Sequence, residues 1–150
     1  MTVLILVRHG EAVTPGPSMT DRARPLTQKG RSDILRLADE IATMLTDLPT
    51  LYHSPYLRTH ETAEIIHQRT GGTLKPQTNL VPSGSPNQVQ DLILGESKTV
   101  LLVTHMPLVG ELAESLLGRR FPFFPGTGLC MQRQNPYTSG GHFLWIKHPA

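Results

Sequence analysis

The sequence predicts an α/β fold, a three-layer α/β/α sandwich around a mostly parallel central sheet. Two short apolar segments, residues 3–7 and 98–104, are typical of strands that are buried on both faces. Segments with helical spacing lie between them, and strands that alternate with helices predict this architecture. The 150 residues contain no internal repeat or linker, so we expect a single domain over residues 1–150.

The first half of the chain supplies the first strand, a loop and a helix. Residues 14–24 form a polar loop that contains prolines and a glycine. Thr27 is the predicted N-cap of the helix that follows. The apolar positions of this helix follow helical spacing and are Ile34, Ala38, Ile41, Leu45 and Leu48. A short strand is expected at residues 51–53.

Three further helices are predicted from their start and stop signals. Ser54-Pro55 is interpreted as a cap followed by proline at the first helical position, in a helix that stops near Gly71-Gly72. Ser85-Pro86 repeats that start signal for a short helix closed by Gly95. The segment from Pro107 to Gly118 predicts the last helix.

The end of the chain is predicted to form a hairpin, because strand-like residues 129–132 and 142–146 surround Asn135-Pro136 and Gly140-Gly141. The tail from Arg119 onward contains no motif that we can assign. The single cysteine, Cys130, excludes an internal disulfide, and we expect it to be a structural core residue.

The bulk properties exclude several classes of partner. A net charge of +2, few aromatic residues and no basic block longer than Arg119-Arg120 argue against nucleic acid. The apolar segments are far shorter than the ~18 residues of a membrane span. Arg8 and His9 interrupt the first apolar segment, so a signal peptide is not expected. Without disulfides or targeting segments, we expect a cytoplasmic protein.

Polar side chains follow three of the predicted strands at the point where each strand ends. Arg8 and His9 follow the first strand, Arg58 comes shortly after residues 51–53, and His105 follows residues 98–104. Ligands bind at the carboxyl ends of the strands in open α/β sheets. The sequence therefore predicts an anion site that contains a nucleophile or a proton carrier.

These residues lie in blocks that resemble the signature blocks of the histidine phosphatase superfamily, in particular of its short SixA-type phosphohistidine phosphatases. The blocks occur in the family's order, over residues 3 to about 110, and are residues 8–12, 24–30, 54–63 and 105–110. The resemblance implies a phosphoglycerate mutase-like fold without the large cap insertion of other branches. It also implies a hydrolase that needs neither a metal nor a cofactor.

His9 is the candidate nucleophile, because its imidazole is neutral near its reference pKa of ~6.5 and nearby arginines disfavour protonation further. Arg8 and Arg58 suit the phosphoryl oxygens. We expect His105 to be protonated when phosphate is bound and to add a third cationic donor. The family's four-residue core matches these positions. Arg24 matches a SixA-type position that could bind phosphate or the partner protein.

A missing carboxylate indicates the substrate. Family members that cleave esters generally place one on a loop that here corresponds to residues 80–87, which contain no Asp or Glu. Alkoxide has a conjugate-acid pKa near ~15.7 and imidazole near ~6.5, so an ester needs a proton donor far more than a phosphoramidate does. This favours phosphohistidine as the substrate, although Glu11 or Asp91 could still reach the site.

The preferred hypothesis is a metal-independent phosphatase that acts on phosphohistidine in a phosphotransfer or carrier protein. The alternatives are a phosphatase for small phosphate esters and a phosphoprotein-binding module without catalysis. The intact nucleophile argues against the second alternative. His60, Glu64 and His67 have metal-like spacing, but a solvated helix face is the preferred interpretation. His53 departs from the small residue usual in the family.

Overall fold

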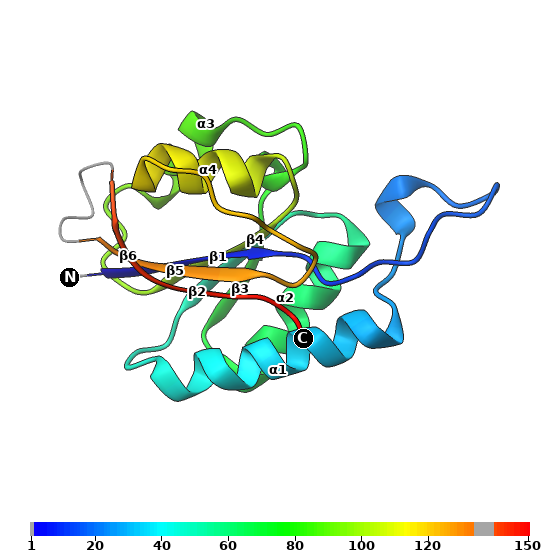
Figure 1. Cartoon of the computed structure of the whole chain (residues 1–150), viewed down its shortest axis with the longest axis horizontal. Helices are drawn as coiled ribbons and strands as arrows, with labels where there is room; N and C mark the ends of the chain where they lie inside the picture. The colour runs from blue at the N-terminus through cyan, green and yellow to red at the C-terminus, as the bar shows by residue number, and fades with distance from the viewer. Residues whose placement is uncertain (1, 134–139) are drawn as a thin grey trace.

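A six-stranded sheet forms the centre of the molecule in a computed structural model that describes residues 2–133 and 140–150 (Figure 1). The strand order is β3-β2-β4-β1-β5-β6. The strands are β1 (Thr2–Arg8), β2 (Thr50–His53), β3 (Thr73–Pro76), β4 (Val100–Thr104), β5 (Gly128–Arg133) and β6 (His142–Lys147). The first four run parallel to one another, β5 pairs with β1 in antiparallel fashion, and β6 pairs with β5 in antiparallel fashion. The prediction of a mostly parallel central sheet is confirmed.

Helices cover both faces of this sheet, as predicted. The helices are α1 (Gln28–Met44), α2 (Leu57–Thr70), α3 (Pro86–Ile93) and α4 (Leu108–Leu117), with short 3-10 turns η1 (Asp21–Ala23) and η2 (Thr78–Leu80). Figure 1 shows α1 and α2 on one face and α3 and α4 on the other. No helix among the described residues is long and apolar enough to cross a membrane.

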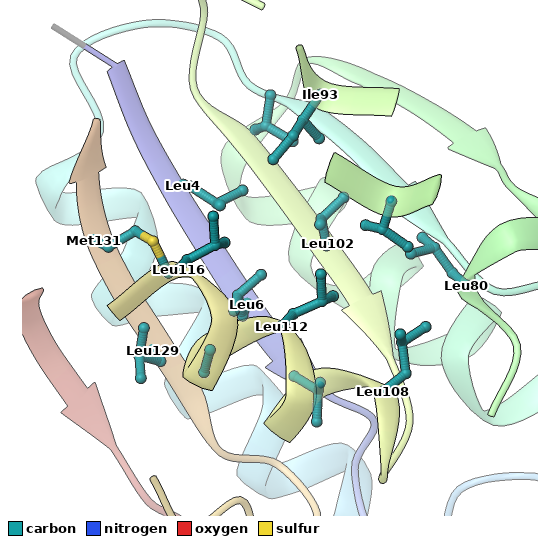
Figure 2. Packing of buried hydrophobic residues seen from close by; sticks show 14 of the residues in the cluster. Leu4, Leu6, Leu80, Ile93, Leu102, Leu108, Leu112, Leu116, Leu129 and Met131 are labelled. Atoms are coloured by element: carbon teal, nitrogen blue, oxygen red, sulfur yellow. The ribbon is translucent and has the colours of Figure 1, made fainter. Parts of the chain in front are cut away.

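The central strands contribute alternate side chains to two separate cores. Leu4 and Leu6 of β1 pack under α4, in the cluster that Figure 2 shows. Ile5 and Val7 point to the opposite face and pack against α1 and α2. Because both faces are covered, the strand contains consecutive apolar residues instead of alternating apolar and polar ones.

Helix α1 begins as predicted and ends earlier than predicted. The Thr27 hydroxyl accepts a hydrogen bond from the Gly30 N–H at 3.0 Å, which is an N-cap contact. The expected helical position of Leu48 is wrong, because α1 ends at Met44 and Leu48 is 66% exposed. The Asp47 carboxylate accepts hydrogen bonds from the N–H and hydroxyl of Thr99, which ties this segment to the start of β4.

The predicted start of the second helix at Ser54-Pro55 is also wrong. The Ser54 N–H donates to the Val103 carbonyl at 3.1 Å, so Ser54 still continues the extended path of β2. Helix α2 starts at Leu57, and its N-cap is Tyr56. This shift places Arg58 in the first turn of α2.

The boundaries of the other helices agree with the sequence signals, whereas one strand was missed and one begins later than predicted. Helix α3 begins at Pro86 after the Ser85 N-cap, and Gly118 ends α4 in the left-handed region at φ 77°. Gly71 ends α2 with φ 68°. The edge strand β3 was not predicted, since it is four residues long and largely exposed. The strand predicted from residue 98 begins at Val100.

The predicted terminal hairpin is confirmed by the antiparallel pairing of β5 and β6. Asn135-Pro136, which we expected between its strands, lies outside the described residues. Cys130 of β5 is fully buried, and burial raises the pKa of its thiol to about 12. This supports the structural interpretation of the cysteine, because the reactive form of a thiol is the thiolate.

Candidate active site

The carboxyl ends of the parallel strands bring together the polar residues that the sequence predicted. Arg58 Nε lies 3.3 Å from His9 Nε2, and the rings of His9 and His105 are 5.3 Å apart in an edge-on arrangement. Arg8 stands at the end of β1, beside His9, and its charge acts on both His9 and Arg58. Two guanidinium groups and two imidazoles therefore meet at one end of the sheet, near the loop that projects from β1 in Figure 1.

The imidazole of His9 is held in one tautomer. Its Nδ1 lies 2.7 Å from the Gly10 carbonyl oxygen, which can only accept, so Nδ1 carries the proton. Nε2 then has a free electron pair and faces Arg58. Burial lowers the pKa of His9 to about 4, and the charges of Arg58 and Arg8 add to this, partly offset by the Gly10 contact. His9 is therefore neutral at neutral pH, with its nucleophilic nitrogen unprotonated.

The two arginines are fixed by backbone carbonyl groups. Arg8 Nη1 donates to the Phe123 carbonyl at 2.8 Å, and Arg58 Nη1 donates to the Asp21 carbonyl at 2.8 Å. Arg8 Nε is buried and has no hydrogen-bond partner within the described part of the chain. Buried N–H groups are normally satisfied, and phosphoryl oxygens are acceptors of the required type.

His105 is held on its other side by a serine. Its Nε2 lies 2.8 Å from Ser54 Oγ, and its buried Nδ1 has no partner among the described residues. Burial, and then the neighbouring His9 and Arg58, lower the pKa of His105 to about 3. The ring is thus neutral in this structure. The expectation of a protonated His105 applies only to the state with bound phosphate, whose negative charge would counter the arginines.

The sequence blocks that resemble the family's signature contact one another around this site. A Cβ on Gly30 would lie 2.2 Å from the Glu11 carbonyl oxygen, so only glycine allows α1 to approach the end of β1 so closely. The Thr62 hydroxyl accepts from the Gly10 N–H at 3.1 Å, and the Glu61 carboxylate accepts from the Leu26 N–H at 2.8 Å. These contacts fix the chain on both sides of His9.

Arg24 lies near the site but is engaged with its own loop. Its Nε donates to the Val13 carbonyl at 2.7 Å, and its Nη1 pairs with Asp21 Oδ1 at 3.0 Å. Arg24 also contributes to the lowered pKa of His9, so its charge reaches the candidate nucleophile. Arg22, interpreted from the sequence as a solvated charge, is exposed but lies over the Tyr56 ring.

Sequence reasoning missed two contributors to the site. The first is Asp21, whose carboxylate pairs with Arg58 Nη2 at 3.2 Å. The second is the tail, in which Phe123 holds Arg8 and the Gly126 N–H donates to the His9 carbonyl at 2.8 Å. Neither belongs to a recognisable motif. The signal available for Asp21 was its position in the polar loop that ends at Arg24. The sequence of the tail contained no signal of a contact with the site.

The alternative proton donors lie elsewhere. Glu11 is exposed, and its carboxylate accepts from the Thr27 hydroxyl at 2.6 Å. Asp91 is exposed on α3, and no contact ties its side chain to the histidines or arginines of the site within the described residues. The expectation that either might act as an acid finds no support in this geometry.

The metal-like spacing on α2 does not form a metal site. His60 pairs with Glu64, while His67 Nε2 lies 2.9 Å from the Gly72 carbonyl oxygen. Within residues 2–133 and 140–150, no three His, Cys, Asp or Glu side chains are grouped as a metal ion requires. His53 is buried, with Nδ1 2.8 Å from the Ser54 carbonyl oxygen.

This fold, with two guanidinium groups and two imidazoles at the ends of the strands, is typical of a class of phosphoryl-transfer enzymes. Comparison with known proteins identifies the class. The chain belongs to the histidine phosphatase superfamily, whose branch 1 model matches residues 4–81. It is 32% identical over 139 residues to the phosphohistidine phosphatase SixA homolog of Haemophilus influenzae, covering 83% of this chain and 84% of that protein. It is 27% identical to phosphohistidine phosphatase SixA of Escherichia coli, covering 98% and 94%.

The structural comparison gives the same answer over nearly the whole chain. The protein histidine phosphatase SixA complexed with tungstate superposes with a TM-score of 0.84 at 25% identity, covering 98% of this chain and 97% of that one. A putative phosphohistidine phosphatase SixA from Agrobacterium tumefaciens has the same TM-score at 19% identity, covering 99% and 98%, and shares the fold. The resemblance inferred from the sequence blocks is confirmed, and the chain is a phosphatase of this superfamily.

Proposed function

We propose that this phosphatase removes the phosphoryl group from phosphohistidine on a partner protein, by way of a phosphohistidine at His9. His9 Nε2 attacks phosphorus, and the bond between phosphorus and the substrate nitrogen breaks, leaving its electron pair on that nitrogen. Water then attacks the phosphorylated His9, releasing phosphate and restoring the neutral ring. The tautomer fixed by Gly10 supports this role, since it exposes Nε2 as the attacking atom.

The cationic groups around His9 are proposed to bind the phosphoryl group. Arg8 and Arg58 supply planar donors that remain charged, and the charges of both act on His9. His105 becomes a third donor once bound phosphate raises its proton affinity. Fixed donors of this kind stabilise the negative charge of the transferring group without reorganising during the reaction. Arg24 is proposed to add longer-range positive charge.

The observation that carries the substrate assignment is that no protonated carboxylic acid lies at the site among the described residues. The segment 80–87 lies beside His105, because Thr104 Oγ1 donates to the Leu80 carbonyl at 2.6 Å, and it contains no carboxylate. Asp21 does reach the site, but its contacts with Arg24 and Arg58 hold its pKa below the usual range. It is therefore ionised and cannot donate a proton. A site without a carboxylic acid to protonate the leaving group suits imidazole far better than an alkoxide.

The surface around the site suits a histidine presented by another protein. A depression of about 510 Å³ next to His105 is lined by residues of α4 and by Phe121. Another, of about 480 Å³, lies beside η1 and includes Arg22. These open depressions beside the site leave room for a macromolecule, and we infer that the partner is a phosphohistidine-bearing phosphotransfer or carrier domain. The names of the relatives given above agree with this substrate.

The test is a comparison of kcat/KM for three substrate classes in one buffer. We expect a phosphohistidine protein to be the best substrate, an aryl phosphate intermediate, and an alkyl phosphate poorest by about a hundredfold or more, the usual contribution of a general acid. Equal rates for alkyl phosphate and phosphohistidine would instead favour the alternative, a phosphatase for small phosphate esters. An absence of turnover with all three would favour a binding module.

A further inference from the structure

The Arg58 guanidinium has the nucleophile at one nitrogen and a carboxylate at another. Its Nε lies 3.3 Å from His9 Nε2, whereas its Nη2 lies 3.2 Å from Asp21 Oδ2. Asp21 comes from η1, in the loop that projects from the end of β1 in Figure 1. The Arg58 guanidinium therefore lies between the proposed nucleophile and the Asp21 carboxylate, which are bound to different nitrogens of the same group.

Asp21 is a solvent-accessible anion in cationic surroundings. Its side chain is 57% exposed, while that of Arg58 is only 6% exposed. The charged and titratable groups facing it are Arg24 from its own loop, Arg58 from α2 and His105 from the loop after β4. A carboxylate here weakens the attraction for any phosphate dianion. Its presence is thus unfavourable for phosphate esters in general and calls for a compensating interaction with the substrate.

The leaving group of phosphohistidine supplies a reason for this carboxylate. When the second ring nitrogen of the substrate carries a proton, breaking the N–P bond leaves a neutral imidazole. When that nitrogen is unprotonated, the same step leaves an imidazolate anion, which is a far stronger base and a poorer leaving group. Phosphohistidine therefore reacts without a general acid only when the substrate ring is protonated at its second nitrogen.

The histidine of the enzyme itself meets the same requirement for a proton on its second ring nitrogen. His9 Nδ1 donates its proton to the Gly10 carbonyl at 2.7 Å, so the ring phosphorylated at Nε2 keeps that proton and later leaves phosphorus as neutral imidazole. Transfer from a substrate histidine to His9 is chemically close to symmetric. An acceptor for the N–H of the substrate ring is the counterpart that this symmetry requires.

We propose that the Asp21 carboxylate is this acceptor: it binds the N–H of the substrate's phosphorylated imidazole and keeps that ring protonated while the N–P bond breaks. The inference rests on the proposed function and names the specificity residue for its leaving group. No proton is transferred to Asp21, and the electron pair of the N–P bond returns to the departing ring. A charge-assisted hydrogen bond of this kind is stronger than a neutral one.

The experiment uses two small substrates, so that docking of a partner protein plays no part. The kcat/KM values for N-phosphoimidazole and 4-nitrophenyl phosphate are measured with the wild type, Asp21→Asn and Asp21→Glu. We expect Asp21→Asn to lower the ratio of the two values by about tenfold, the effect of losing one charged hydrogen bond. Asp21→Glu should restore part of it. Asp91→Asn, an exposed carboxylate on α3, is the matched control and should leave the ratio within about twofold.

A fixed-charge substrate separates hydrogen bonding from general electrostatics. The ring of 1-phospho-3-methylimidazolium is always cationic and has no N–H, so its kcat/KM should be less sensitive to Asp21→Asn than that of N-phosphoimidazole. The pH dependence adds a second readout. Because the carboxylate favours the protonated ring, kcat for N-phosphoimidazole should decline at a higher pH in the wild type than in Asp21→Asn.

The failures of the two proposals are distinguishable. If the wild type shows no preference for N-phosphoimidazole over the ester, the proposed function itself is wrong. If the wild type prefers N-phosphoimidazole and Asp21→Asn keeps that ratio, with both rates lowered equally, Asp21 merely positions Arg58 and the present inference is overturned. If Asp21→Asn lowered kcat/KM equally for the methylated and unmethylated substrates, the proposed hydrogen bond to the substrate ring would be wrong.

Discussion

Two pairs of neighbouring histidines lie at the same end of the sheet, and they differ in their surroundings. His9 and His105 have ring centroids 5.3 Å apart, and His53 and His60 are 4.9 Å apart. The first pair is close to guanidinium groups and has no carboxylate hydrogen-bonded to either ring among the described residues. The second pair ends at Glu64, which contacts His60.

This difference explains why the first pair suits an anion and the second does not. In the first pair, burial and positive neighbours keep both rings neutral, and their field attracts a phosphoryl group. In the second pair, the Glu64 carboxylate contacts His60 and places a negative charge there, which opposes the binding of phosphate. Ring geometry alone would not distinguish the two pairs, whereas the charges around them do.

The largest effect is expected from removing one histidine of each pair. His9→Ala should lower kcat/KM for a phosphohistidine protein by about 10⁴-fold or more, because it removes the nucleophile. His60→Ala should change it by less than about threefold. Steady-state kinetics on both variants tests this, with circular dichroism to verify folding. A His60→Ala loss as large as that of His9→Ala would contradict the assignment of the pairs.

A smaller effect is expected from Arg58→Lys, which keeps the charge and removes the planar donors. We expect a loss of about 10²–10³ in kcat, typical for removal of one transition-state donor. The control is Arg69→Lys, because Arg69 lies near the end of α2 and forms an exposed ion pair with Asp39 of α1. This substitution should leave kcat nearly unchanged. If Arg58→Lys retained wild-type kcat, the positive charge alone would suffice and the proposed role of the planar donors would be wrong.

The buried pair should also make stability depend on pH. The pKa of His9 is about 4 in the folded protein and ~6.5 in the unfolded chain, so the unfolded state binds more protons as the pH falls from 6.5 to 4. The stabilisation by His9 is complete above pH 6.5 and decreases by about 3 kcal/mol on reaching pH 4. Urea unfolding of the wild type, His9→Asn and His60→Asn at both pH values measures it.

The decline in stability between these pH values should be smaller in His9→Asn than in the wild type. His60→Asn should decline more nearly as the wild type does, because His60 lies partly exposed beside Glu64. Identical declines in the wild type and His9→Asn would mean that His9 titrates normally in the folded state.

The smallest effect is expected from removing divalent metals. In the proposed mechanism, Arg8, Arg58 and a His105 that becomes protonated when phosphate binds provide the positive charge that a metal would otherwise place on the phosphoryl group. Activity after exhaustive EDTA treatment should equal that of the untreated enzyme. A loss that Mg²⁺ or Zn²⁺ reverses would contradict this and would direct attention to His60, Glu64 and His67.

The sequence predicted the central parts of this molecule because their signals are local. An apolar segment that ends in Arg8-His9 indicates a buried strand followed by polar groups, and Thr27 is a cap wherever a helix follows it. Arg8, His9, Arg58 and His105 come together because parallel strands end at the same edge of a sheet. For these residues, topology converts local patterns into a site.

The parts that the sequence did not predict depend on contacts between distant segments. Ser54 resembles a helix cap, but its N–H is bound by Val103 and its hydroxyl by His105. Asp21 has a role only because η1 reaches Arg58, and Phe123 only because the tail returns to β1. No spacing rule within one segment contains such information.

The most direct test of the central claim is to trap the intermediate. A partner protein carrying ³²P-phosphohistidine is mixed with the enzyme and quenched in alkali within milliseconds, and labelled peptides are mapped. We predict acid-labile label on the peptide that contains His9 and none in His9→Ala. Label on His105 or His60 instead, or turnover of the wild type with no labelled enzyme at any time, would contradict transfer through His9.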